Sequence, residues 1–311
     1  MRILTAAFLL VVVALVVATR LSAQETNKAV DLIAAARKSI GGKRLDELKT
    51  LSLEANVQRN LASMQLTSDV EILLELPDKY VRTDVANSPG MIVGGGMNVG
   101  FNGDKRLQPV QGSIGPGGAM MIRMGPGGAL PADGPKPTPE EQARVEKQVV
   151  RGAKHELSRL MLGWFASAHP GVAVDYTFAG EAESPDGKAY VIDAKNADGF
   201  SARLFIDQQS NLPLMVTYQA PQRQVMTARP GPRPAGGPPS GDDAQRQTEH
   251  RTQAPTLVDY TLFFDDWRTI DGVRFPHKIR RAMGSETTEE WTVNRVKINP
   301  SIDPKKFAVK S

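Results

Sequence analysis

The four histidines of the chain, His155, His169, His250 and His277, are its only soft nitrogen ligands for a metal ion. No two of them stand three or four residues apart, the spacing at which one helix face offers two zinc ligands. His155 begins the triplet His-Glu-Leu, but Arg159 occupies the place of the second histidine in the H-E-x-x-H zinc motif. The pattern favours ordinary structural histidines over the centre of a zinc hydrolase.

A second group of chemically capable residues lies in the stretch "DDWRTIDGVRFPHKI", residues 265–279. Asp265, Asp266 and Asp271 could share acid–base work or bind calcium, but the stretch lacks the dense oxygen-ligand spacing of a calcium loop. Aspartates also collect at strand ends and turns, where they form local hydrogen bonds. We therefore interpret the stretch as structural, with Asp271-Gly272 as a turn, Pro276 at an edge or bulge, and His277 on a strand.

Five methionines lie near glycine-rich text and could offer thioethers to Cu(I), a soft ion for which no cysteine competes. They are Met91, Met97, Met120, Met121 and Met124. We favour the alternative, a flexible apolar loop, because methionine is an unbranched and adaptable side chain. A cuprous titration after changing these residues to leucine distinguishes the two.

Motifs of nucleophilic and nucleotide chemistry are missing from the sequence. It contains no G-x-S-x-G elbow and no G-x-x-x-x-G-K-[ST] loop, and "GGGMNVG" leads into a strand, so it presents no helix N-terminus to a phosphate. We therefore expect a protein that is not an enzyme and holds no cofactor and no metal. Turnover of ester or peptide substrates would contradict this expectation.

The N-terminus has the features of a secretory signal peptide. Arg2 precedes an apolar run over residues 3–18, and the small-residue stretch "LSA" predicts cleavage after Ala23. An uncleaved N-terminal membrane anchor is the alternative. The chain has no cysteine, so no disulfide is possible, and the predicted location is periplasmic or secreted. Removal of residues 1–23 lowers the formal charge from +4 to +2, too weak to indicate nucleic-acid binding.

The rest of the chain predicts a helix, a long run of strands and a second helix between strands. Thr26 caps a helix that ends at Gly41-Gly42. Thr138 caps a second helix that reaches Phe165, with a break near Gly152. Alternating apolar residues predict antiparallel strands at 51–57 and 64–76, in "LPDKYVRTDV", in a hairpin about Asn102-Gly103, and at 172–183, 188–196, 200–209, 212–219, 257–267, 273–283 and 286–298.

Three segments are too rich in Gly, Pro or polar residues to join this core. They lie at about residues 86–98, 111–137 and 220–255, and the last holds seven prolines. We predict one domain over residues 24–311 with these segments as flexible inserts.

The C-terminal text "LFIDQQSNLPLMVTYQ" and "YTLFFDDWRTIDGVRFPHKIRRAMGSETTEEWTVNRVKINPSIDPKKF" resembles the LolA-like family of periplasmic lipoprotein carriers and outer-membrane lipoprotein-sorting proteins. The N-terminal "LELPDKYVRTDV" and "FNGDKRLQ" are similar to the family as well, so the resemblance covers most of residues 26–310 outside the inserts. The matching positions mark turns and strand starts: Asp207, Leu212-Pro213, Asp266-Trp267-Arg268, Asp271-Gly272, Phe275-Pro276, Asn299-Pro300 and Phe307.

The resemblance implies a mainly β fold with α-helices, namely a LolA-like curved, incompletely closed antiparallel β-barrel with helices covering its mouth. It implies a non-catalytic carrier that binds the acyl chain of a lipid or lipoprotein in an apolar cavity, with transient membrane contact. The candidate cavity residues are Leu53, Val57, Leu66, Ile72, Leu74, Trp164, Phe165 and Trp291; ordinary core packing is the alternative for each.

The chain departs from the family at the residue that ties the barrel to its lid. A basic residue commonly precedes the proline of the second strand unit in the carriers, whereas here Leu76 precedes Pro77. Arg82 on the next strand is the candidate substitute. The alternative function is therefore a periplasmic interaction module of the cell envelope, with a solid barrel core and a disordered Pro/Arg-rich loop at 220–255 that binds a protein partner.

Overall fold

The computed structural model describes residues 24–61, 64–86, 97–107, 138–185, 187–222 and 256–309. The predicted signal peptide and most of the three predicted inserts lie outside these residues, so the domain boundaries remain predictions. Met91, Met120, Met121, Met124 and His250 also lie outside them. No helix within the described ranges is long and apolar enough to cross a membrane.

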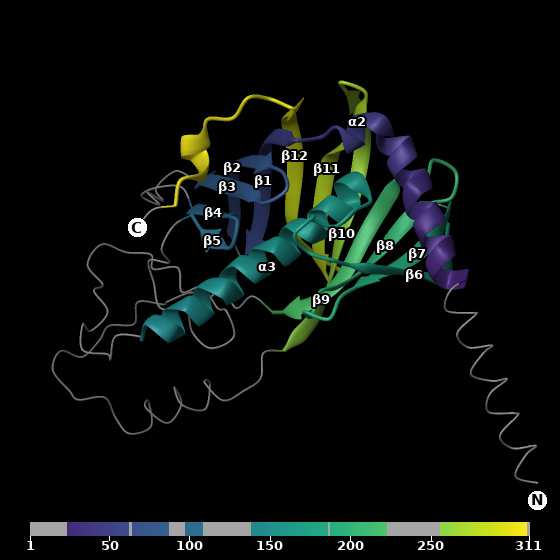
Figure 1. Cartoon of the computed structure of the whole chain (residues 1–311). Coiled ribbons are helices and arrows are strands. Elements are labelled where there is room, and N and C mark those ends of the chain that lie inside the picture. The colour runs from purple at the N-terminus through teal and green to yellow at the C-terminus, as the bar shows by residue number, and fades with distance from the viewer. Residues whose placement is uncertain are drawn as a thin grey trace, which may run out of the picture.

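The described chain forms one antiparallel sheet of twelve strands in the order β5-β4-β3-β2-β1-β12-β11-β10-β9-β8-β7-β6. Pairing of β1 with β12 joins the N-terminal and C-terminal parts of the meander. The sheet is not closed, since β5 and β6 stand at its two edges (Figure 1). The strands are β1 Thr50–Leu61, β2 Met64–Glu75, β3 Lys79–Ala86, β4 Met97–Asn102, β5 Lys105–Arg106, β6 Asp175–Ser184, β7 Gly187–Lys195, β8 Ser201–Asp207, β9 Pro213–Pro221, β10 Leu257–Ile270, β11 Val273–Met283 and β12 Glu286–Ile298.

Two longer helices accompany the sheet. The first spans residues 24–40 and ends where the amides of Gly41 and Gly42 both donate to the Arg37 carbonyl. The second, α3 Pro139–Phe165, begins with the predicted capping box, in which Thr138 and Glu141 satisfy each other's backbone amides. Both predicted helices are confirmed, but the predicted cap of the first is wrong, because Thr26 lies inside that helix. Two short helices, α2 Lys43–Asp46 and the 3-10 helix η1 Pro304–Phe307, were not predicted.

Two local predictions are wrong. The break near Gly152 does not occur, because α3 runs through it for 27 residues. No described residue lies within 4 Å of a β-carbon placed on Gly152, so the glycine costs the helix roughly 1 kcal/mol of propensity without altering its path. The turn predicted near Arg59 and Asn60 does not occur there, because these residues continue the β1–β2 ladder and pair with Leu66 and Gln65.

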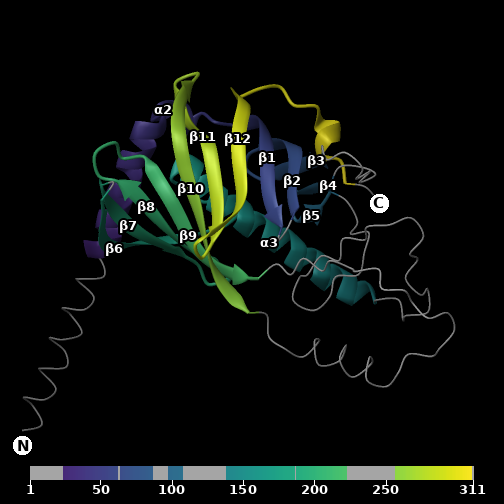
Figure 2. The same ribbon diagram turned by 180° about the vertical axis from the view of Figure 1, so that it is seen from behind.

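The helix α3 crosses the concave face of the sheet, as Figure 1 shows. It contacts β4 and β5 near one edge and β8, β9 and β10 toward the other. The helix over residues 24–40 packs beside β6, where the Lys28 ammonium lies 3.6 Å from the centroid of the Phe178 ring. Seen from behind, the sheet turns its convex surface outward with α3 beyond it (Figure 2). The predicted fold class, a mainly β, incompletely closed barrel with helices over its mouth, is confirmed.

The stretch at residues 265–279 forms the end of β10, a turn and the start of β11. Asp271 and Gly272 both have positive φ values, 49° and 81°, which confirms the predicted turn. Pro276 pairs with Trp267 of β10, and the β11–β12 ladder begins only at Lys278. The proline, which lacks an amide donor, therefore lies in a central strand at a place where its missing N–H interrupts no ladder to β12.

Candidate ligand-binding site on the concave face

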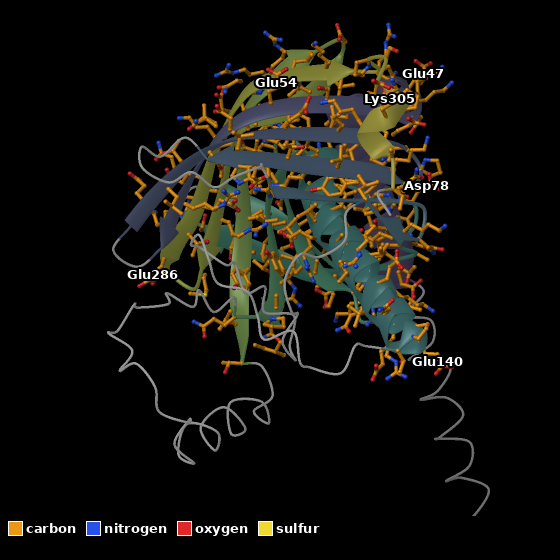
Figure 3. The ribbon with its side chains drawn as sticks, turned by 90° about the vertical axis from the view of Figure 1, so that its left-hand side faces the viewer. Glu47, Glu54, Asp78, Glu140, Glu286 and Lys305 are labelled. Atoms are coloured by element: carbon orange, nitrogen blue, oxygen red, sulfur yellow. The ribbon has the colours of Figure 1, made fainter. Side chains whose placement is uncertain are left out.

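The inward faces of five neighbouring strands change from apolar to ionic along their length. Side chains on a strand alternate between the two faces of the sheet, so residues two apart share a face. The change falls at one end of the sheet, which we call the ionic end; it lies toward Glu286, while Glu47 and Asp78 mark the opposite end (Figure 3). From apolar to ionic, the inward residues are Leu53, Val57 and Arg59 on β1; Ile72 and Ser68 on β2; Tyr80, Arg82 and Asp84 on β3; Phe275, Ile279 and Arg281 on β11; Trp291 and Glu289 on β12.

The predicted cavity residues are almost all inside the main hydrophobic core. Leu53, Val57, Ile72, Leu74, Trp164, Phe165 and Trp291 are at most 3% exposed, and all seven belong to this core. Trp164 and Phe165 of α3 lie against Phe275 of β11, with ring centroids 5.3 Å and 6.0 Å away. Leu66 differs, because it is half-buried and pairs with Arg59 at the ionic end. The structure brings seven candidates together in one core, five of them on the sheet and two on α3, and their role in ligand binding remains a proposal.

In this arrangement α3 itself occupies the concave face. Its buried side includes Leu157, Leu160, Met161 and Trp164, and Gly163 lies directly on the ring of Phe264. A cavity of about 250 Å³ borders the C-terminal end of α3, lined by Met161 and Phe165 among others. A second cavity, of about 370 Å³, is lined by the helix over residues 24–40 and by α2, and no candidate residue of the sheet lines either cavity. An acyl chain therefore needs α3 to move before it reaches the candidate residues.

The polar part of the site is a chain of ion pairs, which we call the ionic network. Its guanidiniums and carboxylates alternate across β1, β3, β12, β11 and α3. Distances between the paired atoms include 3.0 Å from Arg59 to Glu289, 2.7 Å from Arg82 to Asp84 and 3.3 Å from Arg82 to Glu289. The members are Arg59, Arg82, Asp84, Glu156, Arg159, Arg281 and Glu289.

Glu156 connects α3 to this network. Its carboxylate accepts a short hydrogen bond from Arg281 of β11 and lies 3.5 Å from Arg159, one turn along the same helix. The Arg159 guanidinium in turn stacks over the ring of Tyr218 on β9, 4.3 Å from its centroid. The covering helix is thus bound to the sheet by a charged contact on β11 and a cation–π contact on β9.

Burial and neighbouring charges shift the pKa values in the ionic network. Burial alone would raise the pKa of the Glu289 carboxyl, but Arg281, Arg82 and Arg59 lower it to about 2. Burial alone would lower the pKa of Arg82, but the carboxylates of Glu289 and Asp84 raise it above its ordinary value. Glu289 and Arg82 therefore stay ionised across the physiological pH range.

The predicted substitute for the lid contact is wrong in detail. Arg82 pairs with Asp84 and Glu289, both on the sheet, and its guanidinium lies over Trp291. The residue that reaches the covering helix is Arg281, which the sequence reasoning missed. A signal was present, because Arg281 continues the inward alternation of apolar residues along β11, where a charge requires a buried partner.

Two of the three histidines in the described residues, one on α3 and one in the loop after it, take part in aromatic packing. His155 lies edge-on to Phe200 at 5.4 Å between ring centroids, and His169 lies edge-on to Phe101 at 5.4 Å. His169 Nδ1 also accepts a hydrogen bond from the amide of Gly171. Burial, with Lys154 nearby, lowers the pKa of His169 to about 4. These contacts place both rings in structural roles.

No protein-family model and no curated protein matches the chain. Three solved structures are similar to it in the path of the chain. They are a LolA superfamily protein from Nitrosomonas europaea (11% identity, 88% of this chain and 97% of that chain, TM-score 0.45), a domain assigned to outer membrane lipoprotein sorting from Vibrio parahaemolyticus (10%, 91% and 97%, 0.44) and a DUF1329 family protein from Desulfovibrio piger (12%, 90% and 96%, 0.44). The first two bear the family description that the sequence predicts.

Proposed function

We propose that this protein is a non-catalytic binding protein of the periplasm, or a secreted one, that holds the acyl chain of a lipid or lipoprotein. The observation that supports this function best is the cover over the concave face. A single helix lies across an open apolar sheet and contacts strands near both of its edges. The acyl chain replaces α3 on the surface lined by Leu53, Val57, Ile72, Leu74 and Trp291.

The helix α3 is suited to withdrawal because the hydrogen-bonded ladders of the sheet are formed by the strands alone. It is bound by side-chain packing, by Glu156 at Arg281 and by Lys154, whose ammonium lies 2.9 Å from Asp104 in the turn between β4 and β5. The first ten residues of α3, through Gln148, extend beyond the core and are mostly exposed. Withdrawal of α3 therefore leaves the ladders of the sheet intact and exposes apolar surface. Exposure of that surface costs about 25 cal/mol per Å², and an acyl chain recovers this free energy when it covers the surface again.

A reversible crosslink between α3 and the sheet tests the need for this movement. The chain contains no cysteine, so the double variant K154C/D104C can be joined specifically by a bismaleimide with a cleavable disulfide. We expect the joined protein to lose saturable binding of a fluorescent fatty acyl probe. Reduction of the linker should restore the binding.

The matched control joins the other helix to the sheet. In K28C/E181C the linker replaces a 4.0 Å ion pair between the helix at residues 24–40 and β6. This variant should bind the probe before and after reduction alike. Equal binding by both joined proteins would show that α3 does not gate the site, and absence of lipid in an organic extract together with absence of probe binding would contradict the acyl-binding function.

The filled core favours a second candidate, the protein-interaction module with a solid barrel. In this function α3 never leaves, and the segment at 220–255 binds an envelope partner; residues 223–255 of it lie outside the described part of the chain. Deletion of residues 223–255 should then abolish binding to a purified partner and leave the melting temperature unchanged. The crosslinked K154C/D104C protein should bind that partner normally, which separates the two functions.

A further inference from the structure

The concave surface under α3 is amphiphilic, which an apolar ligand alone does not require. Val57, Ile72 and Trp291 give way to guanidiniums and carboxylates at the ionic end. Trp291 lies at the boundary, with the Arg82 guanidinium 4.6 Å from the centroid of its ring. A surface of this kind matches a ligand that carries a charged head on an apolar chain.

The ionic network carries a surplus positive charge. Its four guanidiniums are joined to three carboxylates, which leaves a net charge of +1. The helix contributes one of each, Glu156 and Arg159, so the surplus belongs to the sheet. The sheet alone therefore attracts a single negative charge whether or not α3 covers it.

Arg281 loses one of its two carboxylate partners when α3 moves. Its side chain is 8% exposed, and its carboxylate partners are Glu156 and Glu289. Arg281 Nε lies 3.6 Å from the Glu289 carboxylate and has no hydrogen-bond partner among the residues that the structure describes. Withdrawal of Glu156 leaves a buried guanidinium poorly compensated, which is strongly unfavourable unless another anion takes the place of that carboxylate.

We propose that Arg281 binds the anionic head of the acyl ligand, a carboxylate or a phosphate, and that Glu156 holds this position while α3 covers the sheet. The inference rests on the proposed function, since the head reaches Arg281 only when the acyl chain replaces α3. A guanidinium pairs with two oxygens of a carboxylate or phosphate through parallel N–H donors. The Glu156 carboxylate and the head of the ligand therefore compete for one guanidinium.

The test compares a pyrene-labelled fatty acid with its methyl ester on the mature chain. E156Q removes the competing charge and keeps the size of the side chain. Both probes bind only after α3 has left Arg281, so E156Q should strengthen binding of the acid and of the ester by the same factor. E290Q, which neutralises an exposed glutamate on the outer face of β12, should change neither affinity. The wild-type protein should bind the acid about tenfold more tightly than the ester, because only the acid pairs with the vacated guanidinium.

A second variant and a second ligand pair complete the experiment. R281Q should lower the acid-to-ester ratio to about one. If R281Q does not fold, judged by its circular dichroism, the double variant E156Q/R281Q takes its place, because it also removes the carboxylate that Arg281 compensates. Lysophosphatidic acid against monoacylglycerol, measured in the same way, separates a phosphate head from a carboxylate head. An acid-to-ester ratio of about one in the wild-type protein for both pairs, or an unchanged ratio in the variant that lacks Arg281, overturns the assignment of the head group while acyl binding stands. Absence of binding of all four probes removes the acyl site and this inference with it.

Discussion

Gly163 of α3 lies directly against the ring of Phe264 in β10, so close that a β-carbon on residue 163 would overlap three ring carbons. Both residues are almost completely buried. The helix approaches the sheet at this distance because glycine has no side chain. This contact fixes how deeply α3 enters the concave face.

We predict that G163A destabilises the protein by about 1–3 kcal/mol, because the added methyl group forces the helix or the ring to shift. Alanine also favours a helix over glycine by up to about 1 kcal/mol, so the loss measured by urea unfolding is the difference of the two effects. G152A in the same helix is the control, since no atom of the described part of the chain lies within 4 Å of its β-carbon. It should stabilise the protein, and equal changes in both variants would refute the close contact.

The ionic network should make stability depend on acid pH through Glu289. Arg281, Arg82 and Arg59 outweigh burial and lower its folded pKa to about 2, against 4.5 for an ordinary glutamate. The unfolded chain therefore binds more protons between these values, and a stabilisation of roughly 3 kcal/mol, present above pH 4.5, is lost as the pH falls toward 2. Urea unfolding between pH 6 and pH 3 should show E289Q as less stable at pH 6, with a difference that narrows on acidification.

His169 should give a separate pH dependence at milder acidity. Burial, with Lys154 adding, lowers its folded pKa from 6.5 to about 4, although Asp78 acts in the opposite direction. The unfolded chain gains the proton first, so about 2 to 3 kcal/mol of stability is lost as the pH falls from 6.5 to 4. H169N keeps an acceptor near the Gly171 amide and does not titrate. The slope of stability against pH in this window should therefore flatten in H169N; an identical slope would contradict a neutral buried imidazole.

The turn at Asp271 should matter for stability and not for ligand binding. Its φ of 49° is left-handed, a conformation that asparagine and glycine adopt more easily than alanine. D271A should lower stability by about 1 kcal/mol, whereas D271N and D271G should change it less. Melting curves and probe binding measured together check this, since unchanged melting with lost binding would indicate a direct functional role.

Much of the fold was predictable because its signals are local. Alternation of apolar residues identifies a strand that buries one face, and the strands at 257–267, 273–283 and 286–298 appear as β10, β11 and β12 with nearly these bounds. The capping box at Thr138 and the turn at Asp271-Gly272 depend on residues within four positions of each other. The misplaced turn near Arg59 and Asn60 and the unbroken α3 at Gly152 show where a local preference was too weak to decide.

The sequence by itself therefore determined the meander of strands, both long helices and which residues turn inward. It could not determine what those residues meet, because alternation identifies a buried face without naming its partner. The tertiary structure alone decided that α3 fills the concave face and that Glu156 reaches Arg281, 125 positions along the chain. A charge at an inward position is tolerated only beside an opposite one, and that neighbour comes from packing between distant elements rather than from spacing along the chain.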